Sequence, residues 1–123
     1  MADETQIQWL AEPEPHNYPA ALSYLSLIYD PKTAAALVKK LRNAAPTHFK
    51  AKDIFRASKL SLLGVSNSHV KRDQKKIAKG KALSPILLVR NPALGCVIIA
   101  DGYHRMCAIY SLDEDALIHC KIV

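Results

Sequence analysis

The pattern of apolar and polar positions predicts helices at the start of the chain and strands mixed with helices after them. Apolar residues recur at helical spacing from Pro19 to Tyr29, which predicts a first helix. Asp30 and Pro31 then supply an N-cap and a proline at the first helical position, so a second helix begins there and ends before Pro46. The two helices form a helical hairpin, to which the sequence assigns no role.

The segment before the first helix is polar and contains Pro13 and Pro15, which is typical of an extended arm. Trp9 and Leu10 are its large apolar side chains and are candidates to dock it on the body of the protein. Arm and hairpin together make up residues 1–46. We expect them to pack on the remaining residues, 47–123, and to form one folding unit with them.

Three shorter segments follow the hairpin. Residues 47–50 are a candidate strand, and residues 52–58 make one or two helical turns with Ile54 and Phe55 turned inward. Three leucines are expected to anchor the loop at 64–67: Leu60, Leu62 and Leu63.

A third helix is strongly two-sided. It begins after Asn67 or Ser68, runs to Lys79 and is terminated by Gly80. At about 100° per residue, one face is mainly apolar and holds Val70, Gln74, Ile77 and Ala78. The opposite face is basic and holds Lys71, Arg72, Lys75, Lys76 and Lys79. His69, Arg72 and Lys76 fall close together at positions i, i+3 and i+7.

Two continuous apolar runs predict an antiparallel hairpin. The first strand, 86–89, is too continuously apolar to be half exposed, and the turn at 91–95 leads into the second strand, 96–100. After a further helix and a polar break at 111–115, alternation over 116–123 predicts a last strand. The expected fold is a small α+β domain with helices on one side of a short mixed sheet.

The junction after the second of these strands is the main candidate for chemistry. Asp101 and Gly102 interrupt the apolar run, and a helical pattern starts at Tyr103 with His104 and Arg105 in its first turn. Such a corner leaves backbone N–H groups without partners at a positive helix end, where anions bind. Arg105 offers donors that match phosphate or carboxylate, and His104 titrates near neutrality. We therefore predict a phosphate-type site, against the alternative of a plain turn in which Asp101 caps the helix.

Composition adds a basic character to this picture. The chain of 123 residues is long enough for one domain with its own core, and its net charge of +6 indicates acidic partners. The charge is clustered, since six of the 17 basic residues lie within 71–81. The acidic start, Met1 to Glu4, is unlike a signal peptide, and no apolar run is as long as a membrane span. We expect a cytoplasmic protein without a membrane partner.

Cysteine and histidine spacing predicts no metal centre. Three cysteines, an odd number without metal or redox spacing, each lie among apolar residues: Cys96, Cys107 and Cys120. We expect them to be buried, reduced and unpaired. The five histidines are scattered and show no ligand spacing.

The residues from about Ala51 to Val123 resemble the ParB/sulfiredoxin superfamily, as a short single-domain member. Asp-Gly-Tyr-His-Arg at 101–105 looks like the second motif of that superfamily, and Leu-Ser-Pro-Ile-Leu-Leu-Val at 83–89 resembles its lead-in. The resemblance implies nucleotide binding at the loop, shared with the preceding helix. Mapped by motif, His69, Arg72 and Lys76 would face Gly102, Tyr103, His104 and Arg105.

The relatives differ in activity, and departures from their motifs separate them. Sulfiredoxins carry a nucleophilic cysteine where this chain has Tyr103, so sulfinic-acid repair is not expected. Partition proteins add a helix-turn-helix and a dimer domain after this module, whereas the sequence here stops at Val123, so sequence-specific DNA clamping by the chain itself is not expected. Small serine kinases carry Asp-Gly-His-His-Arg, which implies that Asp101 and His104 assist phosphoryl transfer here. No glutamate is an evident partner, because the candidates lie in the arm or a late loop: Glu4, Glu12, Glu14 and Glu114.

The sequence therefore predicts a nucleotide-binding domain for ATP or CTP, with Mg²⁺ as a companion ion. Phosphotransfer or hydrolysis of the nucleotide is left open. The alternative is a DNA- or RNA-binding or nuclease-like accessory domain that uses the basic helix at 69–81. A third reading is a regulator whose helical hairpin binds a partner. The oligomeric state is open, and a homodimer is one alternative.

Overall fold

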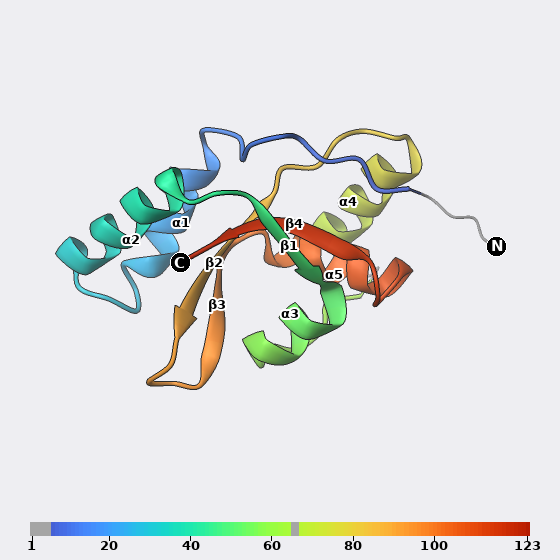
Figure 1. The fold of residues 1–123 in the computed structure, drawn as a ribbon. Coiled ribbons are helices and arrows are strands. Elements are labelled where there is room, and N and C mark those ends of the chain that lie inside the picture. The colour runs from blue at the N-terminus through green and yellow to red at the C-terminus, as the bar shows by residue number, and fades with distance from the viewer. Residues whose placement is uncertain (1–5, 65–66) are drawn as a thin grey trace.

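The computed structural model describes residues 6–64 and 67–123, which form an α+β fold of five helices and a four-stranded mixed sheet (Figure 1). The elements are α1 (Asn17–Leu25), α2 (Pro31–Asn43), β1 (Thr47–Lys50), α3 (Ala51–Ser58), α4 (Ser68–Ala78), β2 (Ile86–Asn91), β3 (Cys96–Asp101), α5 (Tyr103–Leu112) and β4 (Leu117–Ile122). The predicted α+β class is confirmed, although α1 begins and ends earlier than expected and α5 continues into the expected break. No helix in the described part of the chain could span a membrane.

The sheet has the strand order β1-β4-β2-β3. β2 and β3 form the predicted antiparallel hairpin, β2 runs parallel to β4, and β1 pairs antiparallel with β4 on its other side. Cys120 in β4 is opposite Thr47 on one side and Ile86 on the other. The last strand therefore joins the first strand to the central hairpin.

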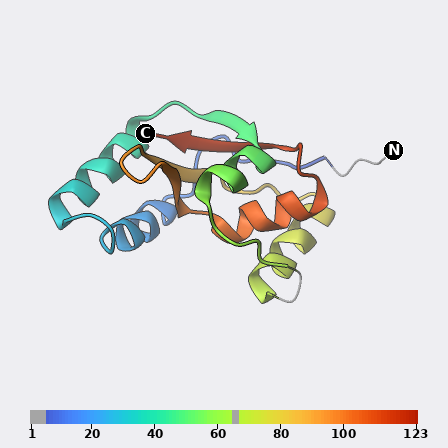
Figure 2. The same ribbon diagram turned by 90° about the horizontal axis from the view of Figure 1, so that it is seen from below.

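Helices cover both faces of the sheet, so the prediction that they lie on one side is wrong. Leu87 and Val89 of β2 pack with α1 and α2, whereas Ile86 and Leu88 pack with α3, α4 and α5. Figures 1 and 2 show the two groups of helices well separated from each other. Because successive residues of a strand point to opposite faces, a strand covered on both faces must be apolar throughout. This explains the uninterrupted apolar run of β2.

Helix α4 begins and ends as predicted, but its buried face is different. The side chain of Asn67 accepts hydrogen bonds from the backbone N–H groups of His69 and Val70 and caps the helix. Val70 and Ile77 are buried, whereas Ala78 is exposed, and Asp73 is buried between them along the chain. A carboxylate on the inward side of a basic helix was not expected, and it lies at the site described below.

Two predicted anchor residues lie on the surface. Leu60 and Leu62 are exposed, and only Leu63 packs against the core. The loop that they were expected to hold includes residues 65–66, which lie outside the described residues.

The N-terminal arm docks beside the lead-in to β2. Leu10 N donates to Leu83 O over 2.8 Å, and Leu83 N donates to Gln8 O over 2.8 Å. The Trp9 ring stacks on His119 of β4 with ring centroids 5.1 Å apart. The docking of Trp9 is thus confirmed, while Leu10 stays at the surface. Farther along the arm, Glu14 lines a cleft together with residues of the β3–α5 junction.

The cysteines are free thiols, but they are not equally buried. Cys107 and Cys120 are buried, whereas Cys96, at the start of β3, is partly exposed. The prediction that all three are buried is therefore wrong for Cys96. Burial raises the pKa of the Cys107 thiol and raises the pKa of Cys120 to about 12. Since the thiolate is the reactive form, both buried groups should be inert at neutral pH.

A thiol reagent should therefore modify one cysteine quickly under native conditions and the other two only after the protein opens. Cys96→Ser should remove the fast phase and leave the slow phases unchanged. Absorbance of the released chromophore, followed in buffer and in denaturant, measures both phases. Three equally fast phases in buffer would contradict this arrangement.

Candidate functional site

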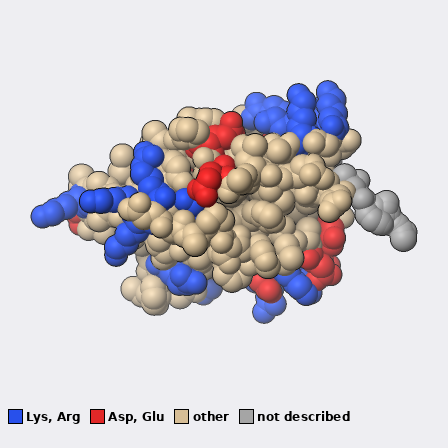
Figure 3. Space-filling model, turned by 45° about the horizontal axis from the view of Figure 1, so that its top comes forward, with Lys and Arg blue, Asp and Glu red and all other residues tan. Residues whose placement is uncertain are grey.

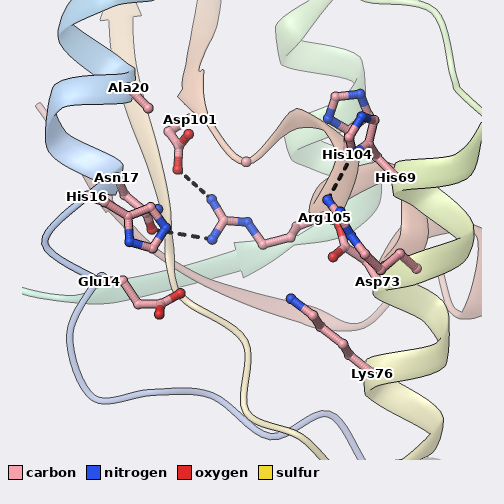
Figure 4. A pocket seen from close by; sticks show the side chains of 12 residues that line it. Glu14, His16, Asn17, Ala20, His69, Asp73, Lys76, Asp101, His104 and Arg105 are labelled. Atoms are coloured by element: carbon pink, nitrogen blue, oxygen red, sulfur yellow. Dashed lines mark hydrogen bonds and ion pairs between the residues drawn. The ribbon is translucent and has the colours of Figure 1, made fainter.

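Three parts of the fold enclose a cleft of about 270 Å³: the arm with the start of α1, the inward side of α4, and the β3–α5 corner (Figure 4). Its lining residues are Glu14, His16, Asn17, Ala20, His69, Arg72, Asp73, Lys76, Asp101, Gly102, His104 and Arg105. The structure thus brings the predicted residues of α4 and of the corner to one cleft, with one exception. Tyr103 faces a neighbouring cavity, and its hydroxyl donates to Ser61 O.

Gly102 makes the sharp entry into α5 sterically feasible. Its φ is +110°, in the left-handed region that L side chains rarely adopt. A Cβ at this position would lie 2.4 Å from Cγ2 of Ile86 in β2. The helix starts here without any side-chain cap, so Asp101 does not play the capping role of the plain-turn alternative.

Asp101 instead pairs with Arg105 one turn into the helix. Arg105 Nη2 donates to Asp101 Oδ2 over 2.6 Å (Figure 4). Arg105 Nη1 donates to Ser84 O over 3.0 Å. Asn17 Oδ1 is a weaker acceptor for Nη1 at 3.4 Å. Only 13% of the Arg105 side chain is exposed. Most of its donors are therefore used by the protein, and its main effect is to fix the corner against α1 and β2.

Burial raises the pKa of the Asp101 carboxyl, and the Arg105 guanidinium opposes that rise without cancelling it. The carboxylate is thus a partly buried group that depends on its arginine partner for the charged form. Its charge and that of Arg105 largely offset each other, so the pair adds little net charge to the cleft.

The free cations of the cleft come from α4. Lys76 extends toward the centre of the cleft, opposite the Asp101–Arg105 pair (Figure 4). Arg72 Nη2 lies 2.8 Å from Nδ1 of His69, which gives that ring nitrogen the role of acceptor. Among the described residues, neither Lys76 nor Arg72 has a carboxylate partner within ion-pair distance. Both are therefore available to an anion.

Two histidines meet at the edge of the cleft. The ring centroids of His69 and His104 are 4.8 Å apart. Burial lowers the pKa of His104, and the neighbouring His69 and Arg72 lower it further, while Asp73 opposes them. His104 is therefore neutral at pH 7 and able to accept a proton.

The contribution of the arm and of α1 to the cleft was not predicted from the sequence. Asn17 is 6% exposed and accepts a hydrogen bond from Ser84 Oγ, which itself accepts one from Glu14 N over 3.0 Å. These contacts join segments about 70 residues apart, for which no local pattern exists. Asp73 was also missed, although a signal was available, because it follows His69 by four residues and therefore shares its helical side.

A second cavity of about 410 Å³ adjoins the first. Both cavities include Ala20, Asp101, Gly102 and His104 in their linings, and the second is otherwise mainly apolar. Tyr24 and Leu60 line its outer part, and Tyr103 lines its inner part. The loop at 101–104 thus has a charged side and an apolar side.

Outside the cleft, lysine and arginine side chains gather at the end of the molecule that carries α4 (Figure 3). Lys71, Lys75 and Lys79 are exposed there and do not line the cleft. Helix α4 therefore presents two cationic surfaces, one directed inward and one facing solvent.

Within residues 6–64 and 67–123, no three metal-ligating side chains of histidine, cysteine, aspartate or glutamate come together. No protein-family model matches the chain, and comparisons with curated proteins and with solved structures likewise gave no match.

Proposed function

We propose that this cleft binds the phosphate groups of a nucleoside triphosphate, ATP or CTP, in a domain of ParB/sulfiredoxin type. The observation that carries the proposal is the position of Lys76 and Arg72, two cations without carboxylate partners in the described structure, across the cleft from the uncapped start of α5. A site of this kind combines fixed charge with backbone donors.

The physical argument depends on which charges are already neutralised. Arg105 is balanced by Asp101, so it keeps the corner rigid at little electrostatic gain for a ligand. Lys76 and Arg72 have no such partner in the described residues, and the dipole of α5 adds a partial positive charge at Gly102. A phosphate between α4 and α5 would therefore replace water around three positive groups.

The resemblance to the superfamily supports the same assignment. Its relatives share the nucleotide between the loop at 101–105 and the helix that precedes the lead-in strand. The residues mapped from that pattern line the cleft, apart from Tyr103, and α4 adds Asp73 to them. The apolar cavity on the other side of the loop could take the base of the nucleotide.

Phosphotransfer or hydrolysis is an extension of this proposal. A neutral His104 at the edge of the cleft would accept the proton of an attacking hydroxyl group or water. Asp101, held by Arg105, would position the start of α5 and would not touch the reacting atoms. In this arrangement the chain supplies positioning and charge, which are the main requirements of phosphoryl transfer.

A second candidate function has an observation of its own. The solvent face of α4 carries Lys71, Lys75 and Lys79 in one patch (Figure 3), which fits the backbone of DNA or RNA. The two functions require different residues on the same helix, and this makes them separable by substitution.

The deciding experiment compares two variants of α4 in binding ATP, CTP and a short DNA duplex. Arg72→Ala with Lys76→Ala should weaken nucleotide binding at least about tenfold, since each charge-assisted hydrogen bond is worth about 1.5–3 kcal/mol. The matched control, a triple variant with alanine at 71, 75 and 79, removes more charge but should leave nucleotide affinity nearly unchanged. Calorimetry over a range of salt concentrations measures both.

The opposite pattern would support the nucleic-acid function. Duplex affinity would then fall with each lysine removed, with a log–log salt slope of about −0.9 per phosphate contacted. A mononucleotide in a cleft should show a much shallower salt dependence. Equal loss of nucleotide affinity in both variants would contradict binding in the cleft.

A further inference from the structure

Asp73 is a carboxylate of the cleft that the fold covers and that has no partner among the described residues. It is 7% exposed, and no hydrogen bond or ion pair to its carboxylate occurs within the described structure. Its neighbours on the same side of α4 are cationic or neutral bases, yet none lies within ion-pair distance. Figure 4 shows the carboxylate directed from α4 toward the cleft, on the side of Arg105.

The carboxylate of Asp73 is open to a ligand. No buried side-chain oxygen or nitrogen among the described residues lacks a hydrogen-bond partner, so the unpaired carboxylate oxygens of Asp73 reach the surface of the cleft while the rest of the residue is covered. Of the other carboxylates of the cleft, Asp101 is paired with Arg105 and Glu14 is exposed. Asp73 is therefore the carboxylate that can bind a positive group of a ligand from inside the cleft.

We propose that Asp73 binds the Mg²⁺ ion carried by the phosphates of the bound nucleotide. This inference rests on the nucleotide binding proposed above. The metal is shared between the ligand and one carboxylate, so the free protein needs no preformed cage, in keeping with the lack of a three-ligand group in the described residues. Mg²⁺ is usually held in this way, through one or two carboxylates together with substrate phosphates and water.

The positions along α4 suit this division of roles. Arg72 and Lys76 flank Asp73 within one turn on either side, so phosphate oxygens that bind these cations lie near the carboxylate. A hard oxygen ligand suits Mg²⁺, whereas the neighbouring imidazoles of His69 and His104 suit softer metals. A carboxylate among cations thus selects the metal-bound form of a polyphosphate over the free form, whose own charge it repels.

The test is a cycle of four affinities for each nucleotide, ATP and CTP, measured by calorimetry: wild type and Asp73→Asn, each in saturating Mg²⁺ and in EDTA. In wild type we expect Mg²⁺ to tighten binding about tenfold, within the usual range of coupling between two ligands. In Asp73→Asn the metal-free nucleotide should bind at least as tightly as to wild type, and the effect of Mg²⁺ should vanish. The control Glu14→Gln, an exposed carboxylate of the same cleft, should keep the effect.

The outcomes distinguish the proposed metal site from the proposed nucleotide binding on which it rests. If neither nucleotide binds in any condition, the proposed function fails and the metal site fails with it. If nucleotide binds and Asp73→Asn retains the full effect of Mg²⁺, only the metal site is overturned. If wild type shows no effect of Mg²⁺ while Asp73→Asn loses affinity in EDTA, Asp73 accepts a hydrogen bond from the ligand and the metal assignment is wrong.

A second measurement avoids any substitution. Mn²⁺ in place of Mg²⁺ should broaden the amide resonances of residues 69–76 when nucleotide is present and leave them sharp when it is absent. Broadening by Mn²⁺ alone, or broadening with nucleotide bound that is centred away from the cleft, would overturn the proposal.

Discussion

Gly102→Ala should destabilise the fold by about 3 kcal/mol or more, because it combines a left-handed backbone with a steric clash. The new Cβ would lie 2.4 Å from Cγ2 and 2.7 Å from Cβ of Ile86, which is fully buried at the start of β2. Neither atom can move without disturbing the central strand pair. The free energy of unfolding, from denaturant titration followed by circular dichroism, measures the effect.

The matched control is Gly80→Ala, which follows α4. Gly80 has a φ of +72°, but no atom lies within 4 Å of an added Cβ. It should therefore cost only the backbone strain, about 1 kcal/mol. Similar losses for the two variants would show that the corner relaxes around a side chain and that close packing against Ile86 does not set the geometry of the site.

Arg105→Met should also cause a large loss of stability, of about 3 kcal/mol, since it leaves the partly buried Asp101 carboxylate without its partner. Methionine keeps the length of the aliphatic stem, so the change mainly removes the guanidinium and its bonds to Asp101, Ser84 and Asn17. The double variant with Asp101→Asn should recover part of the loss, because position 101 then carries no carboxylate that lacks a cationic partner. A loss below about 0.5 kcal/mol would contradict the structural role given to Arg105.

The effect of Arg105→Met should depend on pH in a defined direction. Burial already raises the pKa of Asp101 above its ordinary value of 3.8, and without Arg105 the pKa rises further. A carboxyl whose pKa is higher in the folded state than in the unfolded state favours folding when protonated, and this contribution is lost as the pH rises through the folded pKa. The deficit of the variant against wild type should therefore be largest at neutral pH and shrink toward about pH 4. A deficit that grows as the pH falls would contradict the pairing.

Local features of the site could be predicted from the sequence because neighbouring residues create them. The strand, the Asp-Gly interruption and the first turn of α5 are contiguous, so the pattern from Cys96 to Tyr110 contains the corner. His69, Arg72 and Lys76 lie on one helical side by periodicity alone. Only the resemblance predicted that these α4 residues face the corner at 101–105 across a cleft. Residue spacing within one helix does not show which other segment the helix faces.

The rest depends on contacts between distant segments. Asn17 and Glu14 reach the cleft because the arm pairs with Leu83 and Ser84, and nothing in the arm itself indicates that partner. Lys121 is a similar case, since the alternation of β4 predicts an exposed lysine. It is 3% exposed instead, with Nζ donating to Arg42 O and paired with Glu12, both over 3.0 Å.

The sequence contained enough information to predict that helices cover both faces of the sheet. An apolar run without alternation is already incompatible with a bare face, and the helical hairpin was available to cover it. The hairpin was left without a role because it lies outside the resemblance. In the structure α1 packs directly on β3 and contributes Asn17 to the cleft, so it belongs to the architecture of the site.

The place of β4 between β1 and β2 has a consequence for how the protein folds. The β2–β3 hairpin and α5 are close in sequence and can form early, whereas β1 can join the sheet only through β4. Cys120 must pair with both Thr47 and Ile86, which lie far from it in the sequence. Such pairing slows folding, because the entropy cost of closing the long loops comes before the free energy gained from the strand contacts. We expect the corner of the cleft to take shape before the sheet is complete, and β1 to be the strand whose amide hydrogens exchange first.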